Sequence, residues 1–77
     1  MSINVLIFGH LADITGKDSL QLRDFHDTDQ LIDHLNNLFP SMKKARYACA
    51  VDQKIIRTNT QLREDSTVAL LPPFSGG

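Results

Sequence analysis

The chain has 77 residues, a hydrophobic fraction of 42% and a formal net charge of −1. A chain of this length has room for one domain, and its hydrophobic fraction is typical of a globular protein rather than a disordered one. The near-neutral charge excludes binding to nucleic acid or to an anionic membrane through bulk electrostatics.

The first two predicted elements are β-strands. Residues 3–9, INVLIFG, form a near-continuous apolar run closed by Gly9, which predicts a strand buried on both faces. Residues 12–18, ADITGKD, contain the turn signals Gly16 and Asp18. Residues 19–22, SLQL, then alternate between polar and apolar and predict a short second strand.

Residues 24–40 predict the one convincing helix. Asp27 or Thr28 can cap its N-terminus, and Gln30, three residues after Asp27, would complete a capping box. Pro40 is expected to end the helix. The apolar side chains that share one helical face are Leu31, Ile32, Leu35, Leu38 and Phe39.

Three short strands follow the helix. YACAVD and KIIR are separated by a tight turn at Asp52 and Gln53, and STVALL is ended by two prolines that cannot donate to a ladder. Strands on both sides of one helix favour a single sheet with the helix across one face, and the most apolar strands, the first and last, belong in its centre. We therefore predict an α+β fold of the β-grasp (ubiquitin-like) type with a mixed sheet. Residues 1–77 form its single domain, with a flexible tail over residues 72–77.

A sheet with one helix leaves its other face without a helical cover. Side chains alternate along a strand, so only one set can lie under the helix. The other set would form an apolar patch, which usually marks an interaction site, unless loops cover it. The outward set is Leu6, Phe8, Ala69 and Leu71.

Four polar residues near the start of the helix, Asp24, His26, Asp27 and Asp29, could suggest a metal site. They lack the spacing and the glycine of a calcium loop, and carboxylates in a first turn are expected from capping and the helix dipole. The histidines share no ligand spacing with Cys49. We therefore expect no bound metal.

Cys49 lies among alanines in the middle of a strand and is predicted to pack as a small buried residue. One cysteine cannot form an internal disulfide, and neither a signal peptide nor a membrane-spanning stretch is recognisable, so we expect a cytoplasmic location. Lys43, Lys44 and Arg46 form a basic loop typical of a solvated surface. No serine, histidine and carboxylate cluster as a triad in the sequence, although residues distant in sequence could still meet in space.

The last eight residues, LLPPFSGG, are unusual for the end of a domain. Pro72 and Pro73 would direct the chain stiffly away from the sheet, and the four residues beyond them can extend roughly 13–14 Å. Phe74 offers an apolar anchor. Gly76 and Gly77 have no side chain, so they can enter a narrow channel and bring a carboxylate to a reaction centre.

A carboxylate is ionised at neutral pH and is then a poor acyl donor. Adenylation by ATP would activate it, and a sulfur nucleophile could convert the adenylate to a thiocarboxylate. The sequence contains no phosphate-binding loop, so the activation has to come from another enzyme. These residues therefore predict a carrier that is loaded in trans.

With these features the sequence resembles the small subunits of molybdopterin synthase, in the β-grasp family of sulfur carriers. The resemblance covers nearly the whole chain, through VLIFGHLADITGKD, ACAVDQKII and LREDSTVALLPPFSGG. The ending is the most specific part, because Pro-Pro-x-x-Gly-Gly after an apolar strand characterises the molybdopterin branch. Carriers of the thiamine branch are usually shorter and generally lack the Pro-Pro pair. Asp52 stands where many relatives have asparagine, and both residues suit a turn.

The resemblance implies that Gly77 is adenylated, becomes a thiocarboxylate and donates sulfur to cyclic pyranopterin monophosphate to form the molybdopterin dithiolene. It implies that Phe74, Ser75 and Gly76 thread into a large catalytic subunit, in a heterotetramer, and that the outward patch, in particular Phe8 and Leu71, docks on that subunit. The second partner would be an E1-like adenylating enzyme that uses ATP in trans. The chain itself would bind no cofactor and would not be catalytic alone.

Three other functions remain open from the sequence. The first is a carrier of the same chemistry that serves thiamine or another sulfur pathway. The second is a ubiquitin-like modifier whose activated Gly77 forms isopeptides with lysines. The third is a plain interaction domain.

Overall fold

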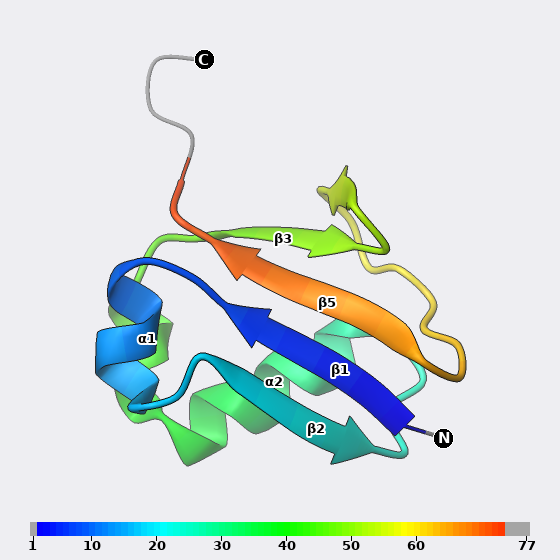
Figure 1. Cartoon of the computed structure of the whole chain (residues 1–77), viewed down its shortest axis with the longest axis horizontal. Helices are drawn as coiled ribbons and strands as arrows, with labels where there is room; N and C mark the ends of the chain where they lie inside the picture. Colours follow the sequence, from blue (N-terminus) through cyan, green and yellow to red (C-terminus); the bar gives the residue numbers. More distant parts are fainter. Residues whose placement is uncertain (1, 74–77) are drawn as a thin grey trace.

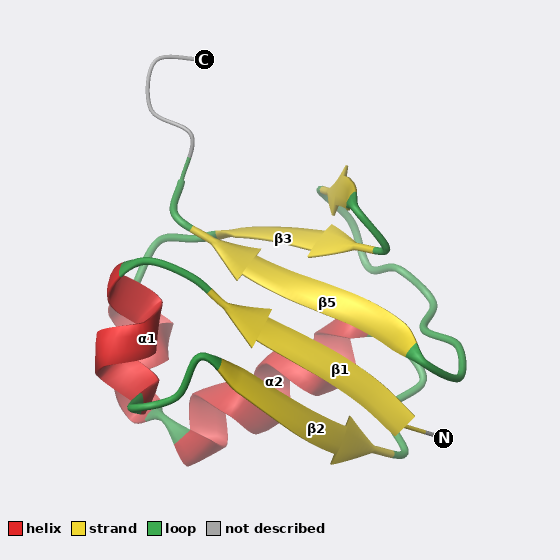
Figure 2. Ribbon diagram, viewed as in Figure 1, coloured by secondary structure: helices red, strands yellow, loops and turns green. Residues whose placement is uncertain are grey.

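The computed structural model describes residues 2–73. Within them, five strands form one mixed sheet in the order β2-β1-β5-β3-β4, and α2 crosses one face of it (Figures 1 and 2). This is the predicted β-grasp arrangement. The elements are β1 (Ser2–Ile7), α1 (His10–Thr15), β2 (Ser19–Arg23), α2 (Thr28–Leu38), the 3-10 helix η1 (Pro40–Lys44), β3 (Ala48–Val51), β4 (Lys54–Ile56) and β5 (Ser66–Leu71).

The first and last strands lie side by side in the centre of the sheet, as predicted. β1 and β5 pair in parallel, from Ile3 opposite Ser66 to Ile7 opposite Leu70, and the other neighbouring strands pair antiparallel. Their inward side chains are buried in a core that α2 closes. The largest contributors to this core include Ile3, Val5, Val68 and Leu70 from the strands and Leu31 and Leu35 from α2.

The prediction that the first strand is buried on both faces is wrong. Burial alternates along β1, and on its outer side Leu6 is 36% exposed. Phe8, the residue after Ile7 at the end of β1, is 45% exposed. The apolar run therefore carries two sets of side chains, of which only the set facing α2 belongs to the core.

The long helix begins and ends close to the predicted residues. Asp27 caps it by accepting a hydrogen bond from the Gln30 backbone N–H (2.9 Å), while Gln30 Oε1 accepts one from the His26 N–H (3.1 Å). The reciprocal bond of the capping box thus reaches one residue further back than predicted. Leu38 was expected on the buried face but is 51% exposed, because the chain leaves the helix there and Met42 of η1 is buried in the core instead.

The short helix α1 was not predicted. Its six residues span less than two turns, too few for a periodic pattern to be recognised. The turn signal Gly16 ends it in a left-handed conformation (φ +73°) and donates its N–H to the Ala12 carbonyl (2.8 Å). Leu11 is fully buried, so α1 closes one end of the core.

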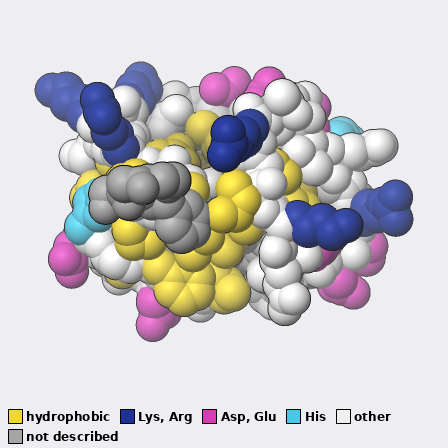
Figure 3. All heavy atoms as spheres, turned by 90° about the horizontal axis from the view of Figure 1, so that it is seen from above, with side chains coloured by type: hydrophobic (Ala, Val, Ile, Leu, Met, Phe, Trp, Pro, Cys, Tyr) yellow, Lys and Arg dark blue, Asp and Glu magenta, His cyan; other side chains and the backbone are white. Residues whose placement is uncertain are grey.

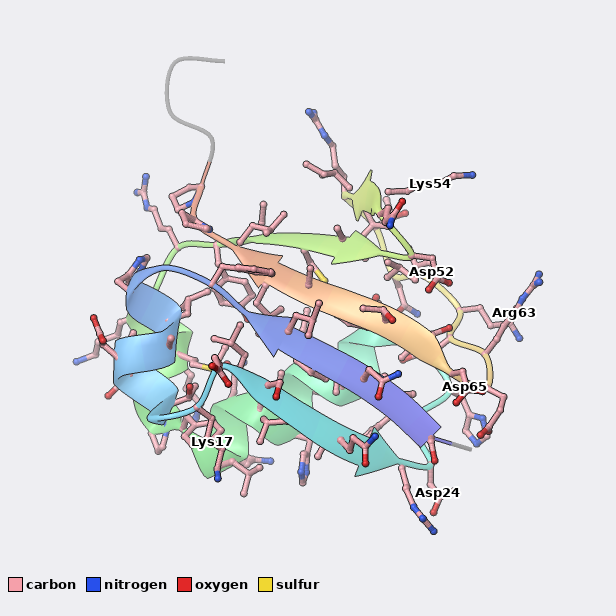
Figure 4. The ribbon with its side chains drawn as sticks, viewed as in Figure 1. Lys17, Asp24, Asp52, Lys54, Arg63 and Asp65 are labelled. Carbon is pink, nitrogen blue, oxygen red and sulfur yellow. The ribbon has the colours of Figure 1, made fainter. Side chains whose placement is uncertain are left out.

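The β3–β4 hairpin has the predicted two-residue turn. Asp52 and Gln53 both have positive φ (49° and 73°), which matches the twist of a tight hairpin. Asp52 also connects the turn to β5, since it exchanges hydrogen bonds with Thr67 through its N–H (2.8 Å) and its Oδ1 (2.9 Å) (Figure 4). The turn of the hairpin is therefore hydrogen-bonded to β5, in addition to the pairing of β3 with β5.

Candidate functional site

The outward face of the sheet is apolar over β5, β3 and β4. The strand register places Leu6, Ala69, Ala50 and Ile55 in one row across β1, β5, β3 and β4. Because two small alanines lie between larger side chains, the row is hollowed in the middle. The result is an open concavity of about 620 Å³.

This surface, called the apolar patch below, includes every outward residue expected from the sequence. It is lined by Leu6, Phe8, Ala50, Ile55, Ala69 and Leu71, with Thr67, Asp52 and Gln53 at one end. The described loops leave it open, and hydrophobic side chains gather on the side of the molecule seen in Figure 3. Within residues 2–73, therefore, no loop covers this face of the sheet.

The other half of the same face is polar. On the outer side of the β1–β2 pair, Asn4 lies opposite Gln21, whose Nε2 donates a hydrogen bond to Asn4 Oδ1 (3.3 Å). Ser2 lies opposite Arg23 on the same side. A partner that buries apolar surface therefore has one half of the sheet to dock on, the half that contains β5.

Sequence reasoning missed two apolar residues of the patch, Ala50 and Ile55, and did not assign the polar residues at its end, Thr67, Asp52 and Gln53, to it. In the pair Ile55–Ile56, the second residue packs against the core and the first is exposed. Alternation within KIIR requires one of the two to face outward, so this signal was present. The position of β3 beside β5, which brings them into the patch, is not contained in any local pattern.

The chain leaves the sheet at the border of the apolar patch. The Phe8 N–H donates to the Leu70 carbonyl (3.0 Å), which extends the β1–β5 ladder by one residue. The ring of Pro72 then lies against the backbone of Gly9, which has φ +66° and ψ −145°. The predicted tail residues Phe74, Ser75, Gly76 and Gly77 lie outside the described residues.

Cys49 lies on the opposite side of the sheet, in the core, as predicted. It is only 8% exposed, and burial raises the pKa of its thiol to about 11. Burial also raises the pKa of Tyr47, with a smaller contribution from the charge of Cys49. A buried thiol with a raised pKa is a poor nucleophile, which agrees with the expected packing role of Cys49.

The other polar residues considered in the sequence analysis have structural roles or lie on the surface. Asp27 caps α2, and the His34 ring stacks at a tilt on Phe25 with centroids 5.0 Å apart. Lys43, Lys44 and Arg46 are exposed on and beside η1. Among residues 2–73, no group of three or more His, Cys, Asp or Glu side chains could hold a metal ion, and no helix is long and apolar enough to cross a membrane.

Residues 5–77 of the chain match the model of the ThiS family. The molybdopterin synthase sulfur carrier subunit of Haemophilus influenzae is 25% identical to this chain over 80 residues. That match covers 97% of this chain and 99% of the relative, so the two proteins correspond over their whole lengths.

Three solved structures share the fold. The putative molybdopterin converting factor subunit 1 of Pyrococcus furiosus superposes with a TM-score of 0.86 at 16% identity, covering 96% of this chain and 99% of the other. SAMP1, a small archaeal modifier protein of Haloferax volcanii, has a TM-score of 0.80 at 18% identity over the full length of both chains. A complex of subunits 1 and 2 of the Helicobacter pylori molybdopterin-converting factor contains a chain with a TM-score of 0.73 at 24% identity, again over both full lengths.

Proposed function

The chain belongs to the ThiS family. From this and from its match with a molybdopterin synthase sulfur carrier subunit, we propose that it is the sulfur-carrier subunit of a molybdopterin synthase. The sequence match with the Haemophilus influenzae sulfur carrier subunit, which spans both proteins, supports a sulfur-carrier role. The structural observation that carries the proposal is the position of the apolar patch, which borders the point where the chain leaves the sheet at Pro72. A partner docked on the patch would lie next to the residues that lead to Gly77.

The proposed chemistry takes place on the carboxylate of Gly77. A carboxylate oxygen attacks the α-phosphorus of ATP, pyrophosphate leaves, and an acyl adenylate forms. Sulfur at the oxidation level of hydrosulfide then attacks the acyl carbon, AMP leaves, and loss of the sulfur-bound proton gives a thiocarboxylate. This group delivers its sulfur to cyclic pyranopterin monophosphate, as one of the two sulfurs of the molybdopterin dithiolene, and the carboxylate is regenerated with oxygen from water.

Residues 2–73 supply docking rather than catalysis in this proposal. The sequence has no phosphate-binding loop, so an E1-like enzyme would bind the ATP and adenylate Gly77 in trans. The general acid and base would come from a large catalytic subunit that docks on the apolar patch, in a heterotetramer. The similar Helicobacter pylori chain was solved in a complex of subunits 1 and 2, which supports a two-subunit assembly of this kind.

The intact mass of the protein purified from cells tests the proposed chemistry. We expect an oxygen-to-sulfur exchange that fragmentation assigns to Gly77, and the same spectrum reports whether Gly77 is the last residue. Incubated alone with ATP and magnesium, the protein should form no adenylate, and addition of the cognate adenylating enzyme should produce one. Self-adenylation of the lone protein would overturn the proposed carrier function.

Two further results would redirect the proposal. Isopeptide adducts between Gly77 and lysines of other proteins, without a thiocarboxylate, would favour the modifier function suggested by the likeness to SAMP1. Complementation separates the two sulfur pathways. A strain that lacks molybdoenzyme activity should be rescued, whereas rescue of a thiamine auxotroph alone would move the carrier to the thiamine pathway.

A further inference from the structure

We propose that Gly9 is a positioning residue for sulfur transfer. Its bare backbone seats the ring of Pro72 and thereby sets the direction in which the chain leaves the sheet. This inference rests on the proposed function, since it concerns how Gly77 is delivered to a reaction centre. It adds a residue near the start of the described chain, far from Gly77 in the sequence, on which that delivery depends.

The contact between Gly9 and Pro72 is closer than any other residue type at position 9 allows. A Cβ atom built on Gly9 would lie 2.7 Å from Pro72 Cγ, 3.6 Å from Cδ and 3.8 Å from Cβ. Side-chain Cβ atoms essentially never approach a heavy atom below 3.0 Å. The backbone of Gly9 (φ +66°, ψ −145°) also lies in a region that is almost exclusive to glycine. Two independent properties therefore require glycine at this position.

Both sides of the contact are held by the fold. The hydrogen bond from the Phe8 N–H to the Leu70 carbonyl (3.0 Å) joins the two segments just before they meet. The Gly9 carbonyl accepts a hydrogen bond from the Ala12 N–H in the first turn of α1 (3.1 Å). Leu71, immediately before Pro72, pairs with Ala48 of β3. The proline ring is thus seated on a rigid support rather than on a loop that could yield.

A shift of this seat displaces the point at which the chain leaves the sheet. A methyl group on Gly9 requires the Pro72 ring to retreat by about 0.7 Å to reach the 3.4 Å of an ordinary contact. The four residues beyond Pro73 can reach at most roughly 13–14 Å, so a shift at Pro72 moves the point from which Gly77 has to reach a reaction centre. Misplacement of reacting atoms by about 1 Å can lower a rate on the order of a hundredfold.

The first experiment replaces glycine at either end of the same helix. Gly9→Ala introduces the clash with Pro72, whereas Gly16→Ala also places a methyl at positive φ (+73°) but with nothing within 4 Å. In reconstituted synthase, we expect Gly9→Ala to lower the turnover roughly tenfold or more, with the dissociation constant for the large subunit within about twofold of the wild type. Gly16→Ala should change neither quantity by more than about twofold.

A double-mutant cycle separates the clash with Pro72 from backbone strain at position 9. Pro72→Ala removes the ring from its seat and should itself lower the turnover without weakening the docking. In Gly9→Ala/Pro72→Ala the new methyl no longer meets Cγ, so the turnover should be about that of Pro72→Ala alone. In the control variant Gly16→Ala/Pro72→Ala, the fold-changes in turnover of the two single substitutions should multiply, because those sites do not touch.

Several results would overturn the inference. One is a turnover of Gly9→Ala equal to that of Gly16→Ala, as expected if the ring absorbs the methyl by changing its pucker. Another is a multiplicative effect in the Gly9→Ala/Pro72→Ala variant. Should Gly9→Ala fail to fold, wild-type turnover in Pro72→Ala would still refute the role of the seat. A wild-type protein that forms no thiocarboxylate in the same assay would instead overturn the proposed function.

Discussion

Cys49 illustrates how the fold determines the chemistry of a single residue. It lies between Ala48 and Ala50 on β3, on the inner side of the sheet, and its thiol pKa is raised by burial from 9.0 to about 11. In a protein that we propose to carry sulfur, a free thiol would be an obvious candidate for the carrier group. Burial makes Cys49 a poor candidate for that role, which agrees with the proposed chemistry on the carboxylate of Gly77.

The raised pKa of Cys49 predicts a pH-dependent stability. Between about pH 9 and pH 11 the thiol stays protonated in the folded state, while the unfolded chain loses this proton. The unfolded state then binds fewer protons, so the free energy of unfolding should fall as the pH rises through this range. Denaturant unfolding of the wild type and Cys49→Ala at pH 8, 9 and 10 measures it. A slope in Cys49→Ala as steep as in the wild type would contradict the prediction.

At the scale of the elements, local sequence patterns correctly predicted those turns and strand ends that are determined by adjacent residues. The Asp52–Gln53 turn and the end of β5 before Pro72 were predicted because each follows from the chemistry of two adjacent residues. α1 was missed because its six residues give no helical period. Leu38 was predicted to face the core but is exposed, and Met42 is buried in the core instead. The position of Met42 depends on the path of η1, which helical spacing cannot predict.

The residues of the candidate site also fall into those that local patterns predict and those that only the strand pairing brings together. Alternation along β1 and β5 identified Leu6 and Leu71 as outward-facing, because the side-chain period of a strand is a local property. Ala50 joined the patch only through the pairing of β3 with β5. The contact of Gly9 with Pro72 connects residues from opposite ends of the sequence, and no pattern in either segment indicates it.

The two halves of the outer face predict opposite effects of one added charge. Phe8→Glu places a carboxylate in the apolar patch, where docking would bury it without a partner, and should weaken binding of the large subunit by about 2–4 kcal/mol. Gln21→Glu, on the polar half, should leave the affinity nearly unchanged. Calorimetric titration measures both. The free energy of unfolding should lie within about 0.5 kcal/mol of the wild type for Gln21→Glu and within about 1.5 kcal/mol for Phe8→Glu, because about half of the Phe8 side chain is covered in the free protein. If Phe8→Glu unfolds the protein, Phe8 belongs to the core and the patch is assigned wrongly.

At the scale of the whole molecule, stability and the proposed chemistry depend on different parts of the chain. The inner face of the sheet holds the core with α2, and half of the outer face forms the apolar patch. The core of the described residues is built from positions between Ile3 and Leu70, whereas the proposed chemistry depends on residues 74–77. A change to those last residues should therefore alter activity without altering the fold.

An alanine added after Gly77 tests this separation. The extension moves the terminal carboxylate by about 3.5 Å and puts a methyl group where glycine is expected, so we expect little thiocarboxylate and little molybdopterin synthesis. Stability and binding of the large subunit should change little. Gly76→Val should act similarly through its bulk. Reconstituted synthase at saturating large subunit is the assay, and wild-type activity of the extended chain would show that Gly77 is not the site.

The parallel pairing of β1 with β5 also governs how the molecule is made. Ile3 pairs with Ser66, so the centre of the sheet closes only after the last strand has been synthesised. Before that, β1–β2 and β3–β4 are two separate two-stranded units, which are marginally stable at best in water. A nascent or truncated chain that lacks β5 would leave Ile3 and Val5 exposed and would be a substrate for proteases rather than a competitor for the docking partner. The synthesis of β5 therefore completes both the core of the sheet and the apolar patch.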